Sequence, residues 1–126
     1  MSKDPVPLKA VHHIEFWVGN AKQAAFFYRN AFGFNQIAYS GLETGDRDKA
    51  SYVMEQGRVR LVFSTPLNGN NGISTHIKKH GDGVKDIAFH VDDAKACYEA
   101  CVARGAKSAS EPIILEDDNG KVTHAS

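Results

Sequence analysis

Cysteine is scarce in this chain. Cys97 and Cys101 are its only two cysteines in 126 residues, four positions apart in a stretch that we predict to be helical. A small secreted domain held together by disulfides would carry more of them. A disulfide or metal pair is the alternative, although CxxxC is not a typical ligand spacing. We therefore expect two reduced cysteines that help a helix to pack, in a cytoplasmic protein.

An excess of charge of one sign is also missing. Lys plus Arg and Asp plus Glu number 15 each, so the formal net charge is zero. A neutral chain offers no general attraction to nucleic acid or to an anionic membrane, and we expect neither as a partner. Nor does any apolar run approach the roughly 20 residues that span a bilayer. The amino-terminal MSKDPVPLKA has no apolar core of a secretory signal.

The chain does contain an internal repeat. Residues 11–32 (VHHIEFWVGNAKQAAFFYRNAF) align with residues 84–105 (VKDIAFHVDDAKACYEACVARG). Val, Ile, Phe and Val recur at matching alternate positions, Ala-Lys follows in both copies, and a glycine ends each helix pattern. Alternation followed by a helical pattern predicts a strand and then a helix. We expect the Ile–Phe–Val face of the strand to pack under its helix in both copies.

The first copy continues into three further predicted strands, at residues 34–40, 51–56 and 59–64. Gly57-Arg58 predicts the hairpin turn between the last two. After a short predicted helix at residues 73–80, the second copy gives a strand, a helix, a strand at residues 107–116 and the start of another from Lys121. By analogy with the first copy, we expect one more strand, equivalent to residues 59–64, in the second copy.

We therefore predict an α+β fold of paired βαβββ modules, the second truncated before its last strand. The expected organisation is a flexible arm at 1–9, a first module at 10–66, a loop and short helix as linker at 67–83, and an incomplete second module at 84–126. An unpaired sheet edge is normally avoided. We thus expect either a piece of a longer protein or a partner that supplies the strand.

The strand faces opposite the expected helices carry the candidate functional residues. His13 and Glu15 lie on this face in the first copy, and Asp86 and His90 lie at the matching face of the second. Pairing of the two strands across a pseudo-twofold axis would bring the four together in a concavity. Such a set could bind a divalent metal, or its members could satisfy one another by ion pairs and hydrogen bonds. We favour the satisfied polar cluster and assign no catalytic, cofactor-binding or metal residue.

A second histidine pair, His76 and His80, is spaced to lie on one side of a helix. Two such residues can bind zinc, but no glutamate follows the first as in HExxH. An exposed basic helix end is the simpler interpretation. The glycines of HGDGV precede a strand instead of opening a helix, so a phosphate loop is not indicated.

Several runs resemble a known family. FWVGNAKQAAFFY, YSGLETG, HGDGVKDIAFHVDDA and ARGAK, within residues 10–126, resemble the N-terminal domain of the 4-hydroxyphenylpyruvate dioxygenases, members of the vicinal oxygen chelate (glyoxalase-like) superfamily. 4-Hydroxymandelate synthase is the near alternative. The resemblance implies a parent enzyme of tyrosine breakdown that uses non-haem Fe(II) and O₂ to convert 4-hydroxyphenylpyruvate, a small aromatic 2-oxo acid, to homogentisate and CO₂.

The resemblance also implies where the iron lies. In the family, two histidines and a carboxylate of the C-terminal domain hold it. Only His13 matches a ligand position here, Asp86 stands where the second histidine would be, and the carboxylate position falls beyond Ser126. We therefore expect no iron in this chain, and expect a structural half that packs on its own C-terminal catalytic domain and supports a homo-oligomer.

Two other functions compete with this one. The chain could be a self-contained glyoxalase-like metal-binding module that dimerises to complete its barrel. It could also bind a small aromatic ligand without chemistry. Only the structural-half hypothesis expects the second module to stop before its last strand.

Overall fold

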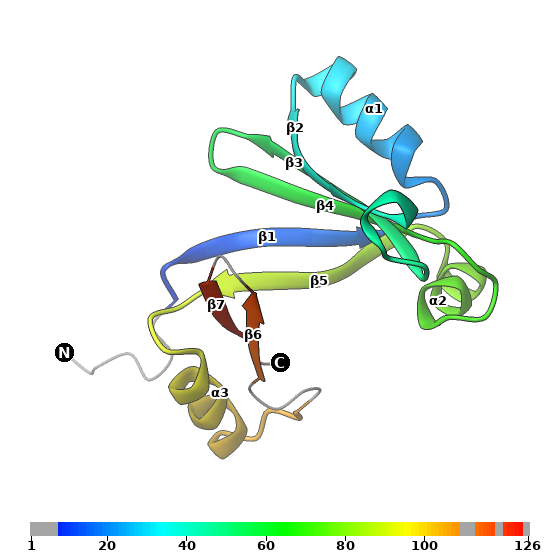
Figure 1. Cartoon of the computed structure of the whole chain (residues 1–126). Helices are drawn as coiled ribbons and strands as arrows, with labels where there is room; N and C mark the ends of the chain where they lie inside the picture. The colour runs from blue at the N-terminus through cyan, green and yellow to red at the C-terminus, as the bar shows by residue number, and fades with distance from the viewer. Residues whose placement is uncertain (1–7, 109–112, 118–119, 125–126) are drawn as a thin grey trace. The chain divides into compact units, whose positions relative to one another are not determined.

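The computed structural model describes residues 8–108, 113–117 and 120–124 (Figure 1). Contacts divide these residues into two compact units. One holds Val11–Ala88, and the other holds the described residues before and after that range. Among the described residues, no helix is long and apolar enough to cross a membrane. The predicted boundaries at residues 9, 66 and 83 stay a prediction.

The first repeat opens with strand β1 (Ala10–Trp17) and helix α1 (Ala21–Phe32). Asn20 starts the helix because its side chain accepts a hydrogen bond from the backbone N–H of Gln23, a group the helix leaves unpaired. Gly33 ends the helix with φ 81°, and its N–H donates to the carbonyl of Arg29 at 3.1 Å. The predicted glycine stop is confirmed.

Three further strands complete the first module. They are β2 (Asn35–Ser40), β3 (Lys49–Gln56) and β4 (Val59–Pro66), with a short 3-10 helix η1 (Leu42–Thr44) between β2 and β3. β2 and β4 each pair antiparallel with β3, and β4 pairs parallel with β1. With β5 (Gly83–His90) the sheet has the order β2-β3-β4-β1-β5. The predicted β-α-β-β-β order is confirmed.

The core lies between α1 and the sheet, since α1 contacts β2, β3 and β4 along one face (Figure 1). Ile14 pairs with Leu61 and Phe16 with Phe63 on this face, so alternate residues of both strands are apolar. Ala21 and Ala25 let the helix approach closely, and Tyr28 lies 5.0 Å from the ring of Phe63. The expected helix-over-strand packing is confirmed in the first copy.

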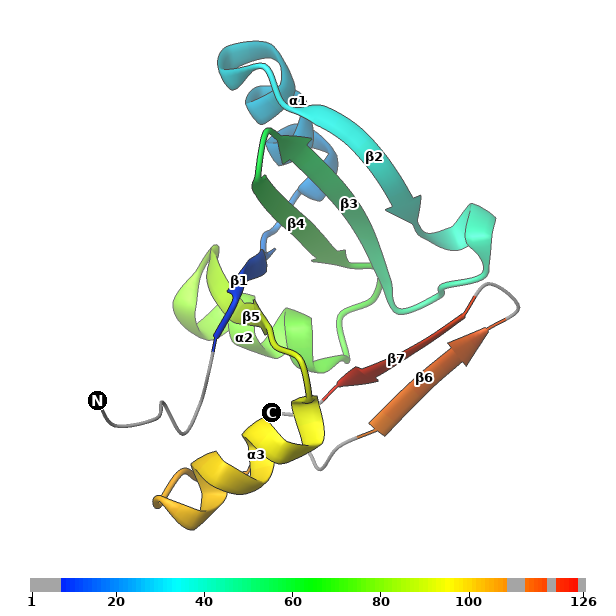
Figure 2. The ribbon, with the colours of Figure 1, turned by 90° about the vertical axis from the view of Figure 1, so that its left-hand side faces the viewer.

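The second repeat comprises β5, α3 (Ala94–Ala103), β6 (Ile113–Asp117) and β7 (Gly120–His124). Asp93 caps α3 by accepting from the N–H of Ala96 at 3.0 Å. β6 and β7 pair antiparallel in a two-stranded sheet (Figure 2). Compared with the first copy, this set has one strand fewer among the described residues. Pro112, expected to interrupt the strand, lies outside them.

One packing expectation is wrong for the second copy. Phe89, which corresponds to Phe16, is 51% exposed, and α3 contains no buried residue. The physical reason is that α3 contacts β7 within its own unit, and its apolar residues do not form a stripe as strong as that of α1. Cys97 and Cys101 are free, half-buried thiols on this helix. Burial, together with the neighbouring thiol, raises the pKa of Cys97 and favours its unreactive protonated form.

The linker is helical as predicted. Helix α2 (Gly72–His80) begins after Asn71, whose side chain accepts from the N–H of Ser74 at 2.9 Å, and ends at Gly81. Ile73 and Ser74 are buried, and α2 contacts β4. The helix therefore belongs to the same compact unit as the first module.

Candidate polar site on the sheet

The face of the sheet opposite α1 is polar. Side chains alternate along each strand, so the residues that follow the core pairs Ile14–Leu61 and Phe16–Phe63 point to the opposite face. Glu15 is paired with Val62 there, and Trp17 with Ser64. On the neighbouring strand, Ser51 is opposite Ser64 and Glu55 is opposite Arg60. We call this surface of β1, β3 and β4 the polar face.

A buried hydroxyl lies at the centre of the polar face. Ser64 is fully buried, and its Oγ lies 2.8 Å from Oγ of Ser51 and donates to Oε2 of Glu15 at 3.1 Å. A buried hydroxyl without partners would cost about 1–3 kcal/mol. The three side chains satisfy one another, so Glu15 is held on β1 by a hydrogen bond from β4.

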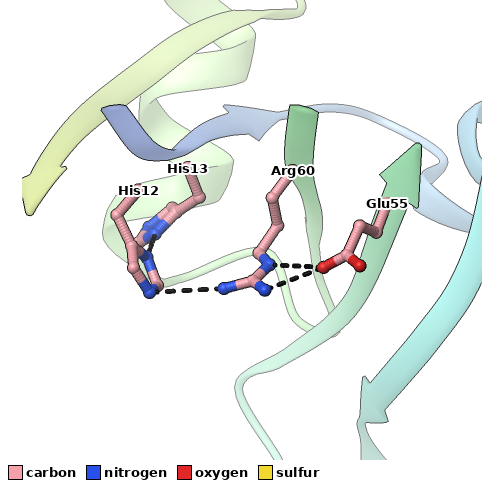
Figure 3. Close-up of polar contacts among 4 residues, drawn as sticks. All are labelled: His12, His13, Glu55 and Arg60. Atoms are coloured by element: carbon pink, nitrogen blue, oxygen red, sulfur yellow. Dashed lines mark hydrogen bonds and ion pairs between the residues drawn. The ribbon is translucent and has the colours of Figure 1, made fainter. Parts of the chain in front are cut away.

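A second network joins three strands at the other end of the polar face (Figure 3). Arg60 donates from Nε and Nη2 to Oε2 of Glu55, at 3.1 and 2.7 Å. Its Nη1 lies 3.3 Å from Nε2 of His12, and Nδ1 of His12 lies 2.8 Å from Nδ1 of His13. The candidate residue His13 thus belongs to a hydrogen-bonded network that ends on the carboxylate of Glu55.

The guanidinium of Arg60 determines which nitrogen of His12 carries the proton. A guanidinium only donates, so Nε2 of His12 must accept and the proton of the neutral ring must lie on Nδ1. That Nδ1–H then donates to Nδ1 of His13, which must also be unprotonated at that atom. The network is complete only when both imidazoles are neutral.

The four candidate residues, His13, Glu15, Asp86 and His90, do not all belong to one unit. His13, Glu15 and Asp86 belong to the unit of Val11–Ala88, whereas His90 belongs to the other. His13 and Glu15 are each half-buried and hydrogen-bonded as described, and Asp86 is half-buried on β5. Nowhere in the described part of the chain do three or more His, Cys, Asp or Glu form a group that could hold a metal ion. The residues described here therefore do not fit an iron triad.

The expectation of mutual satisfaction stays a prediction for the set of four. Within the first unit, His13 instead contacts His12, and Glu15 accepts from Ser64. Arg60 extends the first contact, because its Nη1 lies 3.3 Å from Nε2 of His12. Arg60 could have been found from the sequence, because it and Glu55 lie symmetrically about the predicted turn at Gly57 and so face each other across the hairpin. Ser64 could not, since its partner on β1 depends on long-range register.

A third cluster surrounds Trp17 at the end of β1. The Nζ atom of Lys85 lies 4.8 Å from the centroid of the Trp17 ring, and the ring of His76 meets Trp17 edge-on at 5.2 Å. His80 continues the cluster, with its ring 4.8 Å from that of His76. The spacing prediction that both histidines lie on one side of a helix is confirmed.

Two grooves lie beside α1. The larger, about 490 Å³, is lined by Phe26, Arg29, Gln36 and Tyr52 among others, and the second, about 300 Å³, includes Tyr39 and Glu43. Neither is lined by any of the four candidate residues. Tyr39 donates to Oε2 of Glu43 at 2.7 Å in the smaller groove. This hydrogen bond raises the pKa of Tyr39 to about 12 and lowers that of Glu43.

Comparison with known families gives one match over most of the chain. Residues 12–123 match the profile described as the Glyoxalase/Bleomycin resistance protein/Dioxygenase superfamily. The chain is 51% identical over 115 residues to a 4-hydroxyphenylpyruvate dioxygenase of Xenopus tropicalis, and 47% identical over 119 residues to one of Dictyostelium discoideum. These matches cover 90% and 94% of this chain but 29% and 32% of those proteins, so the chain spans about a third of their length.

Solved structures give the same architecture. A mutant of 4-hydroxymandelate synthase from Streptomyces coelicolor superposes with a TM-score of 0.88 at 28% identity, over 94% of this chain and 35% of that one. Methylmalonyl-CoA epimerase from Mycobacterium tuberculosis gives a TM-score of 0.74 at 16% identity, over 98% of this chain and 83% of that one. The second likeness establishes the fold alone.

Proposed function

Since the chain belongs to the glyoxalase, bleomycin resistance protein and dioxygenase superfamily, we propose that it is the N-terminal, non-catalytic half of a 4-hydroxyphenylpyruvate dioxygenase. The observation that carries the proposal is the 51% identity over 115 residues to the Xenopus tropicalis enzyme, of which those residues make up 29%. The parent would convert 4-hydroxyphenylpyruvate and O₂ to homogentisate and CO₂ in the cytoplasm.

In this proposal the iron belongs to the C-terminal domain of the parent. The polar face supports this placement of the iron, because both of its glutamates already accept hydrogen bonds from other side chains. Glu55 accepts from Arg60, and Glu15 accepts from Ser64. A carboxylate that already accepts hydrogen bonds, on a face whose described residues offer no three-ligand group, is suited to hold strands together. The chain's role is then to fold stably and to pack on the catalytic domain.

The partners proposed are this C-terminal domain and further copies of the same protein. Three phenylalanines of α1 support association, because Phe26, Phe27 and Phe32 are each more than half exposed. Exposed aromatic rings grouped on one helix are typical of surfaces that another protein covers. The substrate, a small aromatic 2-oxo acid, would bind to the parent as a whole.

A chimera tests the proposal directly. The matching 115 residues of the Xenopus tropicalis enzyme are replaced by those of this chain, and oxygen uptake with 4-hydroxyphenylpyruvate is measured together with homogentisate formation. We expect a kcat within about tenfold of the unaltered enzyme, because replacing a structural half leaves the transition state's contacts in place. The separate 126-residue chain, loaded with Fe(II), should show no substrate-dependent oxygen uptake.

The outcomes separate the competing functions. A chimera that folds and binds iron but turns over no substrate would contradict the proposal. Oxygen uptake by the separate chain, abolished by His13→Ala, would instead favour the self-contained metal-binding module. A chimera carrying His13→Ala is the matched control: we expect it to retain activity, since His13 contacts only His12 in the network described above.

A further inference from the structure

Helix α2 presents two histidines that no part of the proposed function uses. His76 and His80 are one helical turn apart, so their side chains leave the helix on the same side. Their ring centroids lie 4.8 Å apart with the planes inclined by 48°. Two imidazoles this close, from one rigid helix, can direct one nitrogen each toward a common ion.

Packing restrains the first of these rings. His76 is half-buried, and its ring meets the indole of Trp17 edge-on at 5.2 Å. Lys85 from β5 covers the same indole at 4.8 Å, so Trp17 is held between two side chains. A ligand whose rotamer is already restricted loses less entropy on binding an ion. His80 is exposed and lies where an ion can arrive from solvent.

The hydrogen bonding of His76 points the same way. Its Nδ1 atom is buried and has no hydrogen-bond partner among the described residues. Buried polar atoms are almost always paired, and an orphan of this kind calls for a physical cause. No neighbour fixes a tautomer of the ring through Nδ1, so the proton of the neutral ring can lie on this buried nitrogen and leave Nε2 to bind an ion.

We propose that His76 and His80 together bind a divalent transition-metal ion, with water completing its coordination. Imidazole suits copper, nickel and zinc, and the usual order of affinity places Cu²⁺ above Ni²⁺ and Zn²⁺. Only two protein ligands, on a helix whose last turn also carries the positive charges of Lys78 and Lys79, make this an exchangeable site instead of a permanently filled one. The site is independent of the iron assigned to the parent's catalytic domain.

Copper is the sharpest probe. Cu²⁺ is added to the metal-free 126-residue chain at about pH 7.5, where imidazole is mostly neutral, and affinity is measured by calorimetry and the coordinated nitrogens by electron paramagnetic resonance. We expect one ion per chain with two imidazole nitrogens. His80→Ala should leave one nitrogen and weaken binding at least tenfold. Zn²⁺ should raise the melting temperature of the unaltered chain and not that of His80→Ala, because an ion that binds only the folded state stabilises it.

Two further variants serve as matched controls. Lys79→Ala changes the same turn of α2 without removing a ligand, and His13→Ala removes a ring of the separate His12–His13 pair. Both variants should bind copper as the unaltered chain does. Equal affinity in the unaltered chain and His80→Ala would overturn the proposal, as would loss of binding only in His13→Ala. His76→Ala also removes packing against Trp17, so the exposed His80 is the deciding position.

Discussion

At the scale of single residues, the contact between Tyr39 and Glu43 has a measurable consequence. The phenol donates to Oε2 of Glu43 at 2.7 Å, across the start of the loop that follows β2. That hydrogen bond, with some desolvation and the carboxylate's charge, raises the pKa of Tyr39 to about 12. The same bond lowers the pKa of Glu43, because it favours the ionised carboxylate.

Titration should reveal this tyrosine as a separate step. Since the folded-state pKa of Tyr39 is raised, its contribution to stability is present below the ordinary value of about 10 and is lost as pH rises toward about 12. The ultraviolet absorbance of tyrosinate should therefore show a late component that Tyr39→Phe removes. Glu43→Gln keeps an acceptor but not the charge, and should move the component back toward about 10. A late component that survives Tyr39→Phe would refute the assignment.

The sequence could identify only part of the polar face. Alternation along β1 predicted that His13 and Glu15 lie on the face away from α1. In the structure His13 contacts His12, and Glu15 accepts a hydrogen bond from Ser64. The pattern could not reveal Ser64 as the partner of Glu15, because their hydrogen bond joins residues 49 positions apart on the parallel strands β1 and β4. Local pattern fixes a face, whereas register across a sheet is decided by the packing of the whole core.

At the scale of elements, helix ends were the most predictable feature. Asn20, Gly33 and Gly81 all act as caps, because their chemistry needs only neighbours along the chain. The second repeat was harder. Its strand and helix form as the first copy suggests, yet Phe89 stays half exposed, since what covers a strand depends on elements far along the chain. Sequence repetition thus predicts secondary structure better than packing.

The stop of α1 gives a prediction at this scale. Gly33→Ala places a Cβ at φ 81°, and that carbon would lie 3.3 Å from Nε2 of Gln56, which donates to the carbonyl of Phe32 at 2.8 Å. Left-handed backbone costs a residue with a Cβ about 1–2 kcal/mol. We expect the free energy of unfolding in urea to fall by about that amount.

Gly72→Ala is the matched control for Gly33→Ala. Gly72 is the first residue of α2, its φ lies outside the left-handed region, and an added Cβ meets nothing within 4 Å. Alanine there restricts the unfolded chain, so stability should stay equal or rise by about 0.4–1 kcal/mol. Equal losses at both positions would show that the left-handed conformation of Gly33 is not what limits α1.

At the scale of the whole molecule, the exposed aromatic residues of α1 are the feature that bears on assembly. Phe26, Phe27 and Phe32 are 59, 55 and 56% exposed, and Phe27 and Phe32 contact each other with centroids 5.8 Å apart. Covering such rings removes apolar area from water, which stabilises the associated state by about 25 cal/mol for each Å² buried. A chain with no net charge has little overall repulsion to oppose association.

We therefore expect the 126-residue chain to self-associate, with a mass by light scattering or sedimentation that rises with concentration. Phe26→Gln should reduce association several-fold while leaving the fold intact, because its ring lies 5.8 Å from the guanidinium of Arg29 and is not part of the core. Val84→Gln is the control: Val84 is 50% exposed on β5, the edge strand at the opposite end of the sheet from β2, and this variant should associate as before. A monodisperse monomer at every concentration would count against α1 as an assembly surface. Equal weakening by both substitutions would mean that association follows general hydrophobicity and not this helix.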